Sequence, residues 1–280
     1  MGKMKKNNDK TPKQDTKKKT KKWRIPILII LVLALMFTVV FYDVYKLGNE
    51  NVLFLFVDED KGNPGIVEVS SIIQFSNLRS KENSIDIDPL STNANLNSLG
   101  ININNSLMKA TDMKQGTEYA KEISKEQSKI DIHRVVVIDS ETLKELVNVV
   151  GYVPIDFNQQ ILILGLKRDI VAKGNVTGIM AKQILQGKAF PIVDPTSIRD
   201  VPEVSLWRVK SKIIGEISIN LLDHAKYDKQ TRKDIYYKIL RLYREDKIKV
   251  YNKNVTLILM DILPEGFGRT IMDFVVNIIS

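Results

Sequence analysis

The sequence contains no cysteine and has two histidines, His133 and His224. Without thiols the chain forms no disulfide and offers neither a cysteine nucleophile nor a thiolate ligand. The histidines lie 91 residues apart, so a zinc site built on several imidazoles is not expected, and both are interpreted as structural. The sequence also lacks a nucleophile elbow, a P-loop and a dinucleotide-binding glycine motif, and no cofactor is assigned from a motif.

The longest apolar run covers Ile25–Tyr42, where 18 consecutive residues carry no charge. As a helix this run would be about 27 Å long, close to the hydrocarbon thickness of a bilayer, about 30 Å. Trp23 precedes the run and Tyr45 follows it, as expected of aromatic side chains at membrane interfaces. A core helix would be apolar on one face, and a signal peptide would show a small-residue cleavage site. We therefore predict an uncleaved transmembrane helix over residues 25–45.

The segment before this helix is strongly basic. Residues 1–24 contain ten lysines and one arginine against two aspartates, so their net charge of +9 equals that of the whole chain. By the positive-inside rule this tail stays in the cytoplasm and residues 46–280 lie outside, which predicts a single-pass plasma-membrane protein. The tail lacks apolar periodicity and interleaved aromatic residues, so we interpret it as disordered and close to lipid head groups. Nucleic acid is not an expected partner.

Residues 46–280 are predicted to form one extracytoplasmic domain of the α/β sandwich class. The continuous apolar runs Asn51–Val57 and Arg134–Ile138 predict strands that are buried on both faces, with helices on both sides of the sheet. Residues Ile66–Phe75 alternate and follow a turn rich in glycine and proline, which predicts the second strand of a hairpin. A third alternating segment, Ser84–Asp88, is followed by Pro89.

A helix is predicted after Asp139 or Ser140, either of which can cap its first turn. Its apolar residues are spaced for one inward face, and Gly151 stands where the helix is expected to end. The inward residues are Leu143, Leu146, Val147 and Val150. Further helices are expected over residues 112–129, 176–186, 203–225 and 228–245, and strands over 153–155, 160–164, 247–251 and 255–260.

An acidic turn, Asp58-Glu59-Asp60, directly follows the first apolar strand. Open α/β sheets bind ligands beyond the carboxyl ends of their strands, so this turn is a candidate site. With Asp86 and Asp88, the carboxylates of Asp58 and Asp60 offer oxygen ligands to Mg²⁺ or Ca²⁺. The more ordinary interpretation is a solvated turn plus the outward face of an edge strand.

A basic pair, Arg208 and Lys212, stands four residues apart on the polar face of the long helix predicted over 203–225, with Lys210 beside it. These side chains are candidates for contact with a lipid phosphate. The solvated face of an ordinary helix is the favoured interpretation.

Two stretches together resemble a known family. The strand Asn51–Val57 ending in Asp58, followed by its hairpin partner, is similar to the opening of LytR–CpsA–Psr domains. The stretch 130–156 resembles that family's later module of an apolar strand, a helix, a glycine and a short strand. The resemblance is closer still to domain-of-unknown-function family 4012, whose members share the anchor, the Asp58-Glu59 turn and Pro64-Gly65.

The resemblance implies a transferase-like fold in the cell envelope. LytR–CpsA–Psr enzymes move a phosphorylated glycan from a polyprenyl carrier to an envelope acceptor, using arginines around the pyrophosphate together with acidic residues and magnesium. At the three places where the family has these arginines, this sequence has Asp60, the stretch 66–69 and the stretch 85–88, none of which contains an arginine. Asp58 alone matches, as a candidate catalytic residue.

Two functions follow as expectations. The first is a non-enzymatic envelope module that binds glycan, lipid or protein on a transferase-like fold. The second is a phosphotransferase acting on polyprenyl-pyrophosphate, with Mg²⁺ held near Asp58. The missing arginines favour the first, since phosphoryl transfer requires cations around the phosphates. Lys61, Lys182, Arg208 and Lys212 are the nearest substitutes, and they are not expected to converge on Asp58.

Overall fold

The structure is a computed structural model of the 280-residue chain. It describes residues 49–61, 65–76, 84–93, 97–163, 166–188, 203–222, 227–262, 264, 266, 268–270 and 273. No helix among these residues combines the length and apolar character needed to cross a bilayer. The predicted transmembrane helix over 25–45 and the basic tail over 1–24 lie outside the described residues.

The described part of the chain contains a five-stranded sheet in the order β3-β2-β1-β4-β7. Its central strand β1 runs parallel to β4, while β2, β3 and β7 each run antiparallel to the neighbour they pair with. The strands are β1 (Asn49–Asp58), β2 (Ile66–Ser76), β3 (Ser84–Leu90), β4 (Arg134–Asp139) and β7 (Ile248–Tyr251). A separate ribbon pairs β5 (Val153–Ile163) with β6 (Leu166–Val176).

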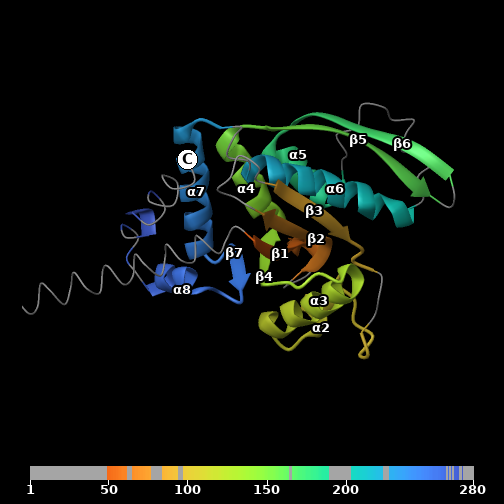
Figure 1. The fold of residues 1–280 in the computed structure, drawn as a ribbon, viewed down its shortest axis with the longest axis horizontal. Coiled ribbons are helices and arrows are strands. Elements are labelled where there is room, and N and C mark those ends of the chain that lie inside the picture. Colours follow the sequence, from red (N-terminus) through yellow and green to blue (C-terminus); the bar gives the residue numbers. More distant parts are fainter. Residues whose placement is uncertain are drawn as a thin grey trace, which may run out of the picture.

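Helices cover both faces of this sheet, as Figure 1 shows. The helices are α2 (Ser106–Lys109), α3 (Met113–Ser128), α4 (Ser140–Val150), α5 (Gly178–Leu185), α6 (Glu203–Leu222), α7 (Lys229–Arg244) and α8 (Val255–Ile262), with a 3₁₀ turn η1 (Glu59–Lys61) after β1. One core joins α2 and α3 to the sheet, and the other joins α4, α5, α6 and α7 to its opposite face.

The side chains of β1 point alternately to the two faces of the sheet, so this one strand contributes to both cores. Leu53 and Leu55 are fully buried in the core with α2 and α3, whereas Phe56 is buried in the core with α4 to α7. Successive side chains of a strand point to opposite faces, so a strand covered on both sides must be apolar throughout. The predicted mixed α/β class, with helices on both faces of the sheet, is confirmed.

The helix predicted after Asp139 is α4. Its first turn is capped by the Asp139 carboxylate, which accepts a hydrogen bond from the Thr142 backbone N–H at 2.6 Å. Gly151 follows the helix with a positive φ of 79°, as predicted for its end. Leu143, Leu146 and Val147 are buried against the sheet.

Two predictions for the later part of the chain were wrong. Residues 255–260, with their apolar and β-branched run, were expected to form a strand, but they belong to helix α8. Asn254 nucleates that helix, because its side-chain Oδ1 accepts the Leu257 N–H at 2.9 Å and its carbonyl accepts the Ile258 N–H at 3.0 Å. The two short strands expected over 153–164 are one long strand, β5, and its partner β6 was not predicted.

Candidate functional site

The candidate site lies at the carboxyl end of β1. Asp58 is the last residue of that strand, and Val57 is in register with Asp139 at the end of β4. Parallel strands thus bring Asp58 and Asp139 to the same edge of the sheet, where α/β proteins bind ligands. The Asp58 side chain is buried, with an exposed fraction of 1%.

Gln186, the C-cap residue of α5, holds two of the acidic side chains together. Its amide Nε2 donates to Asp60 Oδ2 at 2.8 Å and lies 3.3 Å from Asp58 Oδ1. The Asp60 backbone N–H donates to the same Asp58 oxygen at 3.2 Å. A buried carboxylate of β1 and an exposed carboxylate of η1 therefore share one amide, which holds them side by side.

Three lysines line this pocket, whose volume is about 370 Å³. Lys144 comes from α4, Lys182 from α5, and Lys188 from the turn after α5. Lys188 Nζ lies 3.6 Å from Asp60 Oδ2. We call this cluster of three lysines with Asp58, Asp60 and Gln186 the lysine pocket. Lys144 lies in α4, which starts at this edge of the sheet, whereas Lys182 and Lys188 lie in and after α5, which ends there.

Glu141 forms ion pairs with two of these lysines. Its carboxylate accepts hydrogen bonds from Lys182 and, at 3.0 Å, from Lys144, and these bonds lower its pKa. The same bond raises the pKa of Lys182, and the nearby charges of Asp60 and Asp58 raise it further. Lys182 is therefore a stable cation within electrostatic range of Asp58.

Glu59, between Asp58 and Asp60 in the chain, lies within electrostatic range of Asp139 and Lys249. Partial burial raises its pKa, and the negative charge of Asp139 adds to the effect, while Lys249 opposes it. This edge of the sheet thus carries several carboxylates with lysines near them. Such mixed sites can bind a phosphorylated ligand through the cations or a metal ion through the acids.

An apolar cavity of about 200 Å³ lies between the sheet and the helices. Ser218 is the one polar residue among those that line it. The lining residues are Phe54 and Phe56 of β1, Val136 and Ile138 of β4, Ile248 and Val250 of β7, Leu143 and Leu146 of α4, Ser218 and Leu221 of α6, and Ile235 and Ile239 of α7.

Asp58 follows two cavity-lining residues along β1. Phe54, Phe56 and Asp58 are alternate residues of one strand, so their side chains share one face of the sheet. Two residues of a strand span about 7 Å, which is therefore the distance along β1 from the last cavity-lining residue to the buried carboxylate. The apolar lining of this strand is thus followed by a buried carboxylate on the same face of the sheet.

The aspartates predicted on the third strand lie elsewhere. Asp88 is in register with Ile72, which is in register with Leu53, five residues before Asp58 on β1. That offset alone amounts to about 17 Å along the strand. Asp86 lies further still from Asp58, opposite Gln74. Among the residues that the structure describes, no group of three or more acidic or histidine side chains is arranged to hold a metal ion.

The basic residues predicted on the long helix, α6, are also separate from Asp58. Lys212 lies near Asp88 and lowers its pKa, although burial raises that pKa by more. Lys210 is paired with Glu68 of β2, and both side chains are largely buried. The side chains of Arg208 and Lys61 lie outside the described set. Of the two predicted substitutes whose side chains the structure describes, Lys182 lies in the lysine pocket and Lys212 does not.

Sequence reasoning missed Gln186, Lys144 and Lys188. Each comes from a segment remote from Asp58 in sequence, and none belongs to a motif. Lys144 carried the clearest available signal, because it lies in the first turns of a helix that starts at the same sheet edge as Asp58. Lys188 follows Gly187, whose positive φ turns the chain after α5, but that turn alone predicts no function.

Fold and site together define a mixed α/β domain with an acid- and lysine-lined pocket beyond its central strand. No family model matches the sequence, and no curated protein matches it. Among solved structures, the chain is similar to a LytR-Csp2A-Psr enzyme from Actinomyces oris, with a TM-score of 0.47 and 14% identity over 80% of this chain and 76% of that one.

Two further structures show a comparable likeness. TagV of Bacillus subtilis gives a TM-score of 0.45 and 12% identity, covering 82% of this chain and 80% of that one. Protein gbs0355 from Streptococcus agalactiae gives a TM-score of 0.47 and 15% identity, covering 82% of this chain and 76% of that one. The structural neighbours thus include LytR–CpsA–Psr proteins at low sequence identity. The resemblance to family 4012 stays a prediction from the sequence motifs, because no family model matches the sequence.

Proposed function

We propose that this chain is a membrane-anchored, extracytoplasmic module of the cell envelope that binds a polyprenyl-phosphate lipid without turning it over. The part of the isoprenoid chain next to the phosphate occupies the apolar cavity, and the phosphate lies in the lysine pocket. The observation that carries the proposal is that β1 places Asp58 two residues beyond Phe56, which lines the cavity, while Asp58 shares the Gln186 amide with Asp60, which lines the lysine pocket.

The cavity supports the apolar half of this ligand. Its lining comes from three strands and three helices of the sheet face that holds α4, α6 and α7. A cavity with one hydroxyl in its lining, Ser218, offers water too few partners and favours hydrocarbon. Ser218 donates its own hydroxyl to the Ile214 carbonyl at 2.9 Å, which leaves the lining still less polar.

The lysine pocket supports the anionic half. Lys144, Lys182 and Lys188 supply the cations that a phosphate requires, in place of the arginines that the sequence lacks. Asp58, Asp60 and Glu141 balance them, so the pocket is close to neutral before a ligand enters. Near-neutrality favours binding over catalysis, because a transferring phosphoryl group needs surplus positive charge.

Binding of the lipid by the full-length protein in detergent micelles tests the proposal. We expect native mass spectrometry to detect a complex with polyprenyl phosphate. Filling the cavity with Ile239→Trp, or removing one cation with Lys182→Gln, should weaken it about tenfold, the loss expected when one charge-assisted hydrogen bond disappears. Met108→Trp is the matched control, since Met108 is exposed on α2, on the opposite face of the sheet. Equal binding by all four proteins would contradict the proposal.

Phosphoryl transfer is the second candidate, and the burial of Asp58 beside three lysines favours it. The pair Asp58 and Asp60 suits Mg²⁺, which binds to one or two carboxylates and completes its shell with phosphate oxygens and water. Such an ion would supply the positive charge that the pocket lacks. Release of phosphate from polyprenyl-pyrophosphate with Mg²⁺, abolished by Asp58→Asn, would establish an enzyme. Binding without release would support the module.

A further inference from the structure

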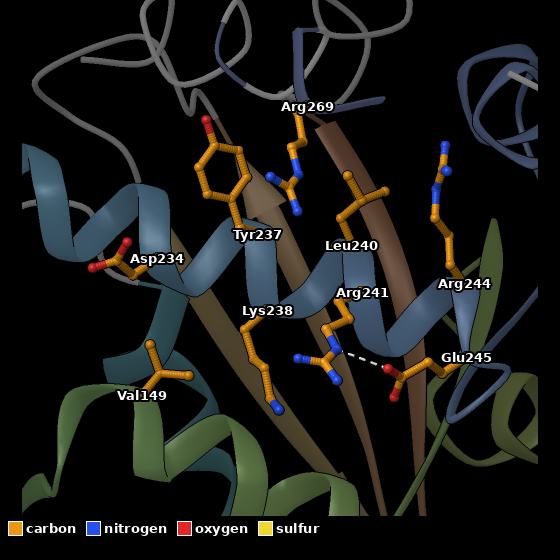
Figure 2. A pocket seen from close by; sticks show the side chains of 9 residues that line it. All are labelled: Val149, Asp234, Tyr237, Lys238, Leu240, Arg241, Arg244, Glu245 and Arg269. Carbon is orange, nitrogen blue, oxygen red and sulfur yellow. Dashed lines mark hydrogen bonds and ion pairs between the residues drawn. The ribbon is translucent and has the colours of Figure 1, made fainter. Parts of the chain in front are cut away.

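A second pocket, of about 630 Å³, lies along the outer side of α7 (Figure 2). It shares no lining residue with the apolar cavity or the lysine pocket. Val149 of α4 lines one side, and Arg269 of the C-terminal segment reaches in from another. A volume of this order lies within the usual range of small-molecule sites, about 300–1,000 Å³.

Cations dominate the lining of this pocket. Lys238, Arg241, Arg244 and Arg269 line it, against the carboxylates of Asp234 and Glu245. The excess is local, because residues 25–280 are neutral and the positive charge of the chain resides in the N-terminal tail. Three of the four cations are guanidinium groups, whose planar donor forks match the oxygens of phosphate.

The helix α7 aligns these groups. Asp234, Lys238 and Arg241 recur at the three- and four-residue spacing that places side chains on one helix face. Figure 2 shows Lys238 and Arg241 pointing toward α4 and Arg269 arriving from the opposite side. Salt bridges hold two of the cations: Lys238 Nζ lies 2.5 Å from Glu145 of α4, and Arg241 Nε lies 2.7 Å from Glu245.

Tyr237 fixes the approach of the C-terminal segment. The guanidinium carbon of Arg269 lies 5.9 Å from the centre of the Tyr237 ring, in a cation–π arrangement. The same tyrosine donates its hydroxyl to Asp273 Oδ1 at 2.7 Å. The ring thus holds an arginine that is distant in sequence against α7.

We infer that this pocket binds a multiply charged phosphate ligand at a site distinct from the lipid site proposed above. A single carboxylate or phosphate would occupy a small part of the volume and meet one arginine. A ligand with two or more linked phosphates is long enough to meet cations on more than one side of the pocket, each through a charge-assisted hydrogen bond. The ligand is either a soluble oligophosphate or a lipid head group with the same chemistry.

Hydrogen–deuterium exchange on the full-length protein in micelles, titrated with tripolyphosphate, tests this inference. Protection of the peptide 234–245 reports the pocket separately from the lysine-rich tail, which also attracts anions. We expect dose-dependent protection whose midpoint rises about tenfold in the double variant Arg241→Gln/Arg269→Gln. Arg269→Lys keeps the charge but loses the fork, so its shift should be smaller.

Two controls decide between specific and general attraction. Lys229→Gln removes an exposed cation from the same helix outside the pocket, and Lys182→Gln removes a cation from the lysine pocket. Both variants should show protection at the same tripolyphosphate concentration as the parent protein. Vesicles of phosphatidylglycerol that displace tripolyphosphate would identify a lipid head group, and failure to displace it would identify a soluble ligand. Absence of protection at millimolar tripolyphosphate, or an equal shift in Lys229→Gln, would overturn the inference.

Discussion

Gln186 is a single side chain on which the geometry of the candidate site depends. Its amide faces two carboxylates, and it is itself largely buried. An amide can donate two hydrogen bonds without adding charge, so it holds Asp58 and Asp60 together where a lysine would form a salt bridge and leave the pocket more positive. Gln186 therefore holds the two carboxylates together without changing the net charge of the pocket.

Replacing Gln186 with leucine removes this amide from a buried carboxylate. We expect the free energy of unfolding to fall by about 1–3 kcal/mol, the usual cost of removing a donor from a buried polar group. Urea unfolding followed by circular dichroism measures the change. Gln183→Leu is the matched control, because Gln183 lines the same pocket from an exposed position of the same helix. A Gln186 variant as stable as this control would show that the amide bonds contribute little.

Glu145 gives the domain a pH-dependent contact between α4 and α7. The amino groups of Lys238 and Lys247, at 2.5 Å and 2.8 Å, hold its pKa at about 2, below the ordinary 4.5. Because the pKa is lowered by folding, this stabilisation is present above pH 4.5 and disappears as the pH falls toward 2. The side chains are partly exposed, so solvent limits the effect to less than about 1 kcal/mol.

Thermal unfolding measured between pH 2 and pH 5 checks this contact. Glu145→Gln should flatten the dependence of the melting temperature on pH in that range, because the substituted side chain no longer gains a proton on unfolding. Glu122→Gln, at an exposed position of α3, is the control. Parallel curves for the parent and Glu145→Gln would refute the contribution of the contact.

Helices α4 and α5 approach closely enough at Gly178 to exclude a side chain. A Cβ built there would lie 2.3 Å from Asn148 Oδ1 and 2.4 Å from the Lys144 carbonyl oxygen. These two helices carry Lys144 and Lys182, so their separation sets the width of the lysine pocket. Gly178 thus contributes to the site without contacting a ligand.

We expect Gly178→Ala to destabilise the domain by about 1–3 kcal/mol, the cost of forcing extra volume into a packed interface. It should also weaken polyprenyl-phosphate binding, because α5 must move away from α4. Gly266→Ala, at a position with open space around it, is the control. Chemical denaturation provides the measurement, and a stability equal to that of the Gly266 variant would mean that the helices adjust freely.

The elements that the sequence predicted well are those with a strong local signal. Strands β1 and β4 are continuous apolar runs, and α4 combines a capping aspartate, an inward apolar face and a terminal glycine. Helix α8 was misread because β-branched residues dominate its sequence, whereas the cap provided by Asn254 decides its conformation. The acidic turn could also be predicted locally, because it directly follows an apolar strand. Gln186 and Lys188 reach it only through the packing of α5, and no periodic pattern in the sequence predicts that packing.

At the scale of the whole molecule, the charge asymmetry of the chain predicts its orientation. The tail over 1–24 holds the entire net charge, and the apolar run Ile25–Tyr42 follows it directly. A protease added to intact cells should therefore digest residues 46–280 and leave an epitope tag at the N-terminus protected. The same protease after membrane permeabilisation is the control. Digestion of the tag in intact cells, with the domain protected, would show the opposite orientation.

The pairing of β7 with β4 has a consequence for the order of biogenesis. Ile248 and Val250 line the apolar cavity, yet their strand is contributed near the end of the chain and joins β4 only after α4 to α7 have been made. Closing so long a loop makes this contact a slow, late step of folding. In a chain synthesised from its N-terminus, the apolar cavity is therefore completed late. If the cavity holds a prenyl chain as proposed, a nascent protein without β7 would be unable to retain that ligand.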